Sequence, residues 1–239
     1  MHDFFAVIPA RAGSKGILGK NMQLIGEKPM IQFTMETALA STELDSSIVS
    51  TDDNEVIELA IEKGVNVPFT RPDNLSTDSA RTTDVLIHAL DWYKLHNKQY
   101  PINIVLLQPT SPFRTANDVD QAVKRFRDSR KNNLISACEL MQHPNDCLMQ
   151  NDEGRFQRIE IGLKSCNHSG RQTFCHTIFI DGAIYISRVD AFLDTGEMIG
   201  QDPEVMMLPQ NHAIDIDTPF DLELARSMYK TGMFESQSL

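Results

Sequence analysis

Short apolar runs alternate with segments of helical periodicity from the N-terminus to Cys138. The runs at residues 4–8, 47–51, 66–69, 102–107 and 134–138 have the length and composition of buried strands. Between them, apolar side chains recur at helical spacing in residues 29–40, 54–63, 82–95 and 118–129. This alternation predicts an α/β domain built on a parallel sheet.

The regular pattern stops at Glu139 and resumes near Phe179. Residues 139–178 are polar, rich in Asn, Gln and His, and without sustained periodicity, so we expect an excursion with one or two hairpins. Strand patterns at residues 179–186 and 205–208 and a helix over residues 219–229 follow. We therefore expect a single domain over residues 1–239, with residues 139–178 as a small insertion.

Composition narrows the classes of function. A chain of 239 residues that is 41% hydrophobic can bury a substantial core. Its net charge of −11 argues against general binding to nucleic acids or anionic membranes, so any phosphate ligand must be held locally. The first five residues contain neither a basic segment nor a long apolar stretch, so we expect no signal peptide, no membrane span and a cytoplasmic location.

The cysteines and histidines of residues 138–176 do not predict a metal site. No two of the four cysteines form a Cys-x-x-Cys pair, and the spacing to nearby histidines fits no standard zinc pattern. We expect reduced thiols, no zinc and no redox cofactor. The residues concerned are Cys138, Cys147, Cys166, Cys175, His143, His168 and His176.

A basic, glycine-rich loop follows the first predicted strand: Arg11-Ala-Gly-Ser-Lys-Gly-Ile-Leu-Gly-Lys-Asn21. It carries three cations in an otherwise acidic chain, and no acid occurs until Glu27. Glycines let backbone N–H groups approach oxyanions, and Arg and Lys donate charge-assisted hydrogen bonds. The loop therefore predicts a triphosphate site, with a solvated basic turn as the alternative.

The glycine spacing excludes two common phosphate-binding designs. Five residues separate Gly13 from Gly19 and Asn21 follows Lys20, whereas a Walker A loop needs four residues and then Ser or Thr after the Lys. The spacing Gly-x-x-Gly-x-x-Gly also differs from the dinucleotide fingerprint, which disfavours an NAD-linked oxidoreductase.

Two carboxylates precede the last predicted helix. Asp215 and Asp217 alternate with Ile214 and Ile216, so in extended backbone both carboxylates point to one face. That placement suits Mg²⁺ beside substrate phosphates. The alternative is a purely structural role, in which Asp217 or Thr218 caps the helix.

The glycine loop resembles the signature of the acylneuraminate cytidylyltransferases, in Ile8-Pro-Ala-Arg-Ala-Gly-Ser-Lys-Gly16 with Lys20-Asn21. Further segments resemble this family in the same order along the chain: Ser50-Thr-Asp52, Arg71-Pro-x-x-Leu-Ser-x-Asp78, Leu107-Gln-Pro-Thr-Ser-Pro112, Arg171-Gln172, Gly182-Ala-Ile-Tyr185 and Ile214-Asp-Ile-Asp217. The related Kdo cytidylyltransferases carry an Arg-Tyr-x-Ser type loop, so the Gly-Ser-Lys-Gly form favours the nonulosonate branch.

The resemblance implies a doubly wound, mostly parallel α/β fold of the nucleotide-diphospho-sugar transferase type. It implies transfer of CMP from CTP to the anomeric hydroxyl of a nonulosonic acid, with N-acetylneuraminate as the default, and release of pyrophosphate. It further implies Mg²⁺ and a homodimer in which residues 139–178 reach into the partner's sugar pocket.

The resemblance also assigns roles to single residues. The triphosphate loop would comprise Arg11, Gly13, Ser14, Lys15, Gly16, Lys20 and Asn21, and the cytidine would be held by Arg71 and Thr82. The sugar would contact Gln108, Arg171 and Tyr185, although Tyr185 also fits a core position. Mg²⁺ would be bound by Asp215 and Asp217, which with Arg11 and Lys20 form the catalytic set. Asp217 is the first candidate for the base that takes the hydroxyl proton.

Three positions depart from the family pattern and leave the acceptor open. Asp146 stands where some members have Lys, Asp181 where Asn is usual, and Cys175 where Pro is common. The alternatives are legionaminate, an eight-carbon 3-deoxy sugar acid, or a nucleotide-sugar binding protein without turnover.

Overall fold

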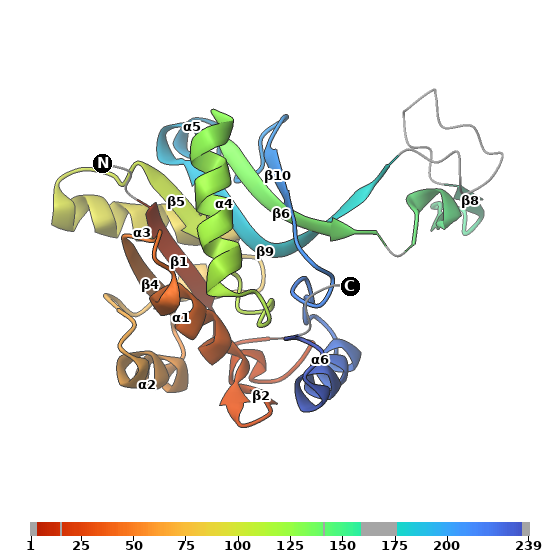
Figure 1. The fold of residues 1–239 in the computed structure, drawn as a ribbon, viewed down its shortest axis with the longest axis horizontal. Coiled ribbons are helices and arrows are strands. Elements are labelled where there is room, and N and C mark those ends of the chain that lie inside the picture. Colours follow the sequence, from red (N-terminus) through yellow and green to blue (C-terminus); the bar gives the residue numbers. More distant parts are fainter. Residues whose placement is uncertain (1–3, 15, 141, 159–175, 236–239) are drawn as a thin grey trace.

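A six-stranded sheet forms the centre of the protein in the computed structural model, which describes residues 4–14, 16–140, 142–158 and 176–235 (Figure 1). Its strand order is β10-β6-β9-β5-β1-β4. The strands are β1 (Phe4–Ala10), β4 (Ser46–Thr51), β5 (Asn103–Leu106), β6 (Asn133–Glu139), β9 (Ile178–Arg188) and β10 (Glu204–Met207). β9 is antiparallel to β5 and β6, and the other pairs are parallel. The predicted fold class, a doubly wound and mostly parallel α/β sheet, is confirmed.

Helices cover both faces of this sheet, and β1 is therefore buried on both of its faces. Phe4 and Ile8 pack in one core cluster with side chains of α1 (Met30–Ala40), α2 (Asn54–Lys63) and α4 (Ala116–Ser129). Phe5 and Val7 point the other way, into a cluster with α3 (Thr82–Asn97) and α5 (Val189–Thr195). A third cluster lies under the last helix, α6 (Pro219–Thr231), beside the short strands β2 (Leu24–Ile25) and β3 (Lys28–Pro29).

Most predicted elements form within a few residues of their expected bounds, but the strand expected at residues 66–69 does not form. Residues 66–69 make only an isolated bridge at Asn66, with a second at the following residue Thr70, since Pro68 has no N–H to donate to a ladder. β9 is antiparallel to both of its neighbours in the sheet, β5 and β6, an orientation that the pattern of apolar residues did not indicate. The short helix α5 was not predicted, because seven residues are too few for periodicity to show.

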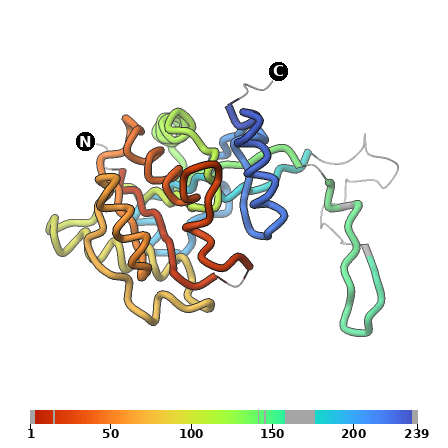
Figure 2. The backbone as a smooth tube through the Cα atoms, turned by 90° about the horizontal axis from the view of Figure 1, so that it is seen from below, coloured from red at the N-terminus to blue at the C-terminus, as the bar shows by residue number. Residues whose placement is uncertain are grey.

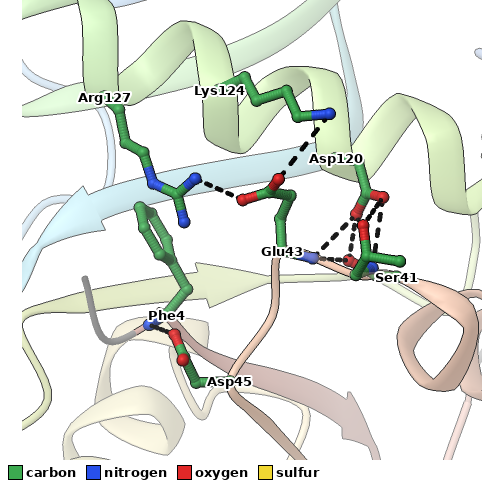
Figure 3. Close-up of polar contacts among 8 residues, drawn as sticks. Phe4, Ser41, Glu43, Asp45, Asp120, Lys124 and Arg127 are labelled. Carbon is green, nitrogen blue, oxygen red and sulfur yellow. Dashed lines mark hydrogen bonds and ion pairs between the residues drawn. The ribbon is translucent and has the colours of Figure 1, made fainter. Parts of the chain in front are cut away.

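The connection between α1 and β4 is tied to α4 by a polar network (Figure 3). Asp120 of α4 accepts hydrogen bonds from Ser41 Oγ at 2.5 Å, Thr42 N at 3.0 Å and Thr42 Oγ1 at 2.7 Å. Glu43 forms ion pairs with Arg127 and, at 3.7 Å, with Lys124. These contacts fix the helix layer over the sheet at the end where β1 begins.

The excursion leaves the body of the protein as a ribbon. β6 and β9 continue beyond the sheet as a pair, and a hairpin of β7 (Leu148–Gln150) and β8 (Phe156–Arg158) projects beyond them (Figures 1 and 2). Exposed apolar side chains gather here: Leu148, Met149, Phe156, Phe179 and Ile180. The hairpin confirms part of the expected irregular segment; Cys166, His168, Arg171 and Cys175 lie outside the described residues.

None of the helices in the described part of the chain is both long and apolar enough to span a membrane.

Candidate active site

A cavity of about 360 Å³ opens at the carboxyl edge of the sheet, where β1 and β5 end. Ten of the residues expected at a nucleotidyltransferase site line it: Arg11, Gly13, Ser14, Lys20, Asn21, Arg71, Thr82, Gln108, Asp215 and Asp217. Lys15 and Arg171 lie outside the described residues. The structure thus brings together side chains that are far apart in the sequence.

The glycine loop folds back on itself after β1. Asn21 Nδ2 donates to the carbonyl oxygen of Arg11 at 3.0 Å, and Ala12 N donates to Asp52 Oδ1 at 2.9 Å. Gly16 does not line the cavity; a Cβ at this position would lie 2.8 Å from the carbonyl oxygen of Asp217. Gly16 therefore lets the loop pack against the segment that carries the two carboxylates.

The cations at the cavity are held by carboxylates. Lys20 Nζ lies 2.8 Å from Asp217 Oδ1, and the Lys20 side chain is only 14% exposed. Arg11 pairs with Asp78. A triphosphate that enters the cavity can take over both cations without a change of protein fold, since each is already directed by a partner.

Arg71 is buried beneath this region. Its Nε donates to Ser50 Oγ at 3.2 Å, and its guanidinium also donates to the Ser50 carbonyl oxygen. Burial lowers the pKa of Arg71 to about 10, which the nearby charge of Asp52 partly opposes. The side chain still carries its charge at neutral pH, so it presents a fixed cation to the cavity.

Asp215 and Asp217 differ in their environments. Burial raises the pKa of Asp215 despite a hydrogen bond with Thr110, and the negative charge of Asp217 raises it further. Asp215 Oδ1 is buried and has no hydrogen-bond partner among the described residues. The Asp217 side chain is 71% exposed.

The carboxylate pair is not part of the helix cap. Thr218 is the N-cap of α6, where its side chain accepts from Asp221 N in a capping box, and Pro219 is the first helical residue. Ile216 is buried, and its N–H donates to the Thr110 carbonyl at 2.9 Å. Of the two expected cap residues, Thr218 and not Asp217 caps the helix, and both aspartates line the cavity.

The arrangement fits a magnesium ion shared with a phosphate ligand. Mg²⁺ is usually bound by one or two carboxylates together with phosphate oxygens and water. The pair supplies two such carboxylates, including the buried oxygen of Asp215 that lacks a partner.

Gln108 and Gly182 meet beside Asp215. Gly182 has φ +78°, and a Cβ there would lie 2.8 Å from Gln108 Oε1 and 3.7 Å from Asp215 Oδ2. The absence of a side chain at Gly182 lets these polar groups approach each other. Tyr185, expected at the sugar, is partly buried against the core cluster of α3 and does not line the cavity, and burial, to which the charges of Asp181 and Asp215 add, raises the pKa of its phenol.

Several polar contributors were not assigned from the sequence. Thr110, Asp52 and Asp78 all contact the site residues, as described above. Each lies within a segment that carries the family resemblance, so the signal was present, but sequence spacing alone gives no partner. Asp146 is exposed in the turn Pro144–Asp146 and does not line the cavity.

Comparison with known families shows the family to which the chain belongs. The family described as "Cytidylyltransferase" matches residues 5–156, which include the glycine loop and Gln108. The chain belongs to this family. The acylneuraminate cytidylyltransferase resemblance is thereby confirmed, and the N-acylneuraminate cytidylyltransferase of Escherichia coli is among its relatives, at 29% identity over 92% of this chain and 50% of that protein.

Relatives of matching length carry other sugar names. The chain is 30% identical to CMP-N,N'-diacetyllegionaminic acid synthase of Legionella pneumophila, over 93% of this chain and 94% of that protein. It is 31% identical to pseudaminic acid cytidylyltransferase of Campylobacter jejuni, over 95% and 96%. Among solved structures, CMP:2-keto-3-deoxy-manno-octonic acid synthetase complexed with CTP superposes with a TM-score of 0.69 at 21% identity, covering 96% of this chain and 99% of that chain. At that identity the likeness shows the fold alone.

Proposed function

We propose that this cytidylyltransferase transfers CMP from CTP to the anomeric hydroxyl of a nine-carbon nonulosonic acid and releases pyrophosphate. The observation that carries the proposal is the convergence of the glycine loop and the Asp215/Asp217 pair on one cavity. The loop supplies cations and backbone donors for a triphosphate, and the pair supplies the ligands for Mg²⁺.

The triphosphate enters by exchange of partners. Its oxygens take Lys20 from Asp217 and Arg11 from Asp78, so both cations come to face the α-phosphate and the departing pyrophosphate. Cations that are aimed at the charge that develops during phosphoryl transfer stabilise the transition state. The same exchange frees Asp217 to face the metal.

Asp215 and Asp217 would hold Mg²⁺, which when bound polarises the phosphate and orients it for in-line displacement. The sugar hydroxyl attacks the α-phosphorus while Gln108, which lines the same cavity, orients the sugar. Asp217, released from Lys20, is our candidate for the base that accepts the hydroxyl proton. Arg71 and Thr82 would hold the cytidine end of the nucleotide.

The choice of sugar acid rests on the names of the relatives. The relatives of matching length are named for diacetyllegionaminate and pseudaminate, and a further relative for N-acylneuraminate. All three support a nine-carbon acid over the eight-carbon alternative. We keep N-acetylneuraminate in the proposal beside the other two acids. The choice among the three depends on the segment that contains Arg171, to which we assign contacts with the sugar, and Arg171 lies outside the described residues.

A homodimer is the second part of the proposal. The ribbon of β6 and β9 and the hairpin beyond it expose five large apolar side chains on a narrow projection, and such a surface is typical of an interface. A second copy of the chain is its occupant in our proposal. Light scattering should give twice the monomer mass at working concentration, and a monomer would refute this part.

The test of the reaction is CTP-dependent pyrophosphate release, followed with wild type and with Asp217→Asn. The asparagine keeps the shape but removes the charge that pairs with Lys20 and would hold the metal. Release by wild type and near-complete loss in the variant, with an unchanged unfolding temperature, is the expected result. Tight CTP binding without release with any acid would favour the binding-protein alternative.

A further inference from the structure

Arg114 is the largest of the fully buried side chains in the described part of the chain, with 2% exposed. Its hydrogen-bond acceptors are all uncharged: the carbonyl oxygens of Ala183 at 2.5 Å and Gln108 at 3.3 Å, and Thr34 Oγ1 at 2.8 Å. The charges of Asp118 and Asp181 lie close enough to act on it. Burial lowers the pKa of Arg114 to about 10, so the guanidinium stays charged at neutral pH.

The three groups that accept hydrogen bonds from Arg114 belong to three different parts of the fold. Gln108 follows β5, Ala183 comes directly after Gly182 in β9, and Thr34 is in α1. The Thr34 hydroxyl, which accepts from Arg114, lies 3.5 Å from the Gln108 carbonyl oxygen. One buried cation thus joins the backbones of the two segments that meet at the acceptor side of the cavity.

This placement is costly for stability alone. A buried charge requires compensating hydrogen bonds, and an apolar side chain of similar volume would fill the same space at less expense. What Arg114 provides, and an apolar residue would not, is a fixed separation between Gln108 and Gly182. That separation is critical, because the room between Gln108 Oε1 and the Gly182 backbone does not admit even a methyl group.

We infer that Arg114, together with Thr34, is a positioning residue that sets the spacing of Gln108 and Gly182 and thereby the affinity for the sugar acceptor. The inference rests on the proposed function, in which Gln108 contacts the sugar. None of the hydrogen bonds that Arg114 makes among the described residues goes to the glycine loop or to Arg71. Loss of this positioning should therefore change acceptor binding and leave CTP binding nearly unchanged.

Thr34 offers a matched pair of variants. Thr34→Val keeps the shape of the buried side chain but removes the hydroxyl and leaves a buried Arg114 N–H without its acceptor, whereas Thr34→Ser keeps the hydroxyl and removes a methyl group. Substitution of Arg114 itself removes all three contacts and risks unfolding, whereas Thr34→Val removes only one of the three. KM for acceptor and for CTP would be measured from pyrophosphate release, and the unfolding temperature by calorimetry.

We expect Thr34→Val to raise the acceptor KM roughly 5- to 10-fold and to leave the CTP KM within about twofold of wild type. Thr34→Ser should restore a near-normal acceptor KM even if it lowers the unfolding temperature more. Equal changes in both KM values, no change in either, or the same acceptor defect in Thr34→Ser would each overturn the inference. An inactive wild type with every acid would instead refute the proposed function.

Discussion

Gly182→Ala perturbs the acceptor side of the cavity by one methyl group. Gly182 has φ +78°, a conformation that costs an L-residue about 1–2 kcal/mol, and the methyl would lie 2.8 Å from Gln108 Oε1. Ordinary contact begins near 3.4 Å, so the amide must retreat by roughly 0.6 Å. The far end of a glutamine side chain moves easily, so this retreat should cost little stability.

The functional effect should be larger than the stability effect. A misplacement of about 1 Å at a positioning group reduces a rate by up to about 100-fold, so a retreat of roughly 0.6 Å should reduce kcat/KM for the acceptor about 10-fold. The CTP KM should change little, because the methyl is too close only to Gln108 and lies at an ordinary contact distance, 3.7 Å, from Asp215 Oδ2. The backbone cost alone should lower the unfolding temperature by about 2–8 °C.

Gly64→Ala is the matched control. Gly64 ends α2 with φ +80°, and a Cβ there meets nothing within 4 Å. Gly64→Ala introduces the same backbone strain as Gly182→Ala, but away from the cavity. It should therefore lower the unfolding temperature by a similar amount and leave both KM values unchanged. The reasoning is refuted if Gly182→Ala keeps the wild-type kcat/KM for the acceptor, or if Gly64→Ala shows the same kinetic defect.

Three further variants test other parts of the structure. Gly16→Ala should raise the Mg²⁺ concentration that gives half-maximal pyrophosphate release, because its methyl presses on the Asp217 backbone at 2.8 Å; an unchanged magnesium titration would contradict this. Burial raises the pKa of Asp181, so its ionisation penalises the folded state as the pH rises from about 3.9 to the folded pKa. The free energy of unfolding of Asp181→Asn should increase relative to that of wild type as the pH rises through that window, and the difference should stay constant above it. A difference that grows as the pH falls would contradict this reasoning. Burial would raise the pKa of Asp120, but hydrogen bonds from the α1–β4 connection outweigh it and hold the pKa below its ordinary value. Asp120→Asn should therefore be less stable than wild type at neutral pH, with a deficit that vanishes as the pH falls through the folded pKa, and a deficit that persists there would contradict the assignment.

Local signals in the sequence were sufficient for much of the fold. Helix α2 was predicted with its observed bounds, because Asp53 caps its first turn and Gly64 supplies the left-handed residue at its end. β1 was found from its apolar run, and the structure shows why both of its faces are apolar: each packs under a helix layer. The orientation of β9 was not predictable, because the direction of a strand depends on its partners.

The candidate site was predictable as a set of residues but not as a set of contacts. The ion pair of Lys20 and Asp217 joins positions 197 residues apart. A local sequence pattern cannot predict a contact over that separation. Tyr185 has the same apolar neighbours in the sequence whether it lies in the core or at a ligand. Arg114 was missed because an arginine near a turn is normally exposed, and only the packing of α1, β5 and β9 around it shows that it is buried.

The most direct measurement of the central claim is pyrophosphate release from CTP and Mg²⁺ with a panel of acids, with product mass determined for each. The panel holds N-acetylneuraminate, N,N'-diacetyllegionaminate, pseudaminate and the eight-carbon acid Kdo. We predict release with at least one nine-carbon acid, a CMP-linked product, and none with Kdo. Absence of release with every nine-carbon acid, from folded protein that binds CTP, would contradict the account.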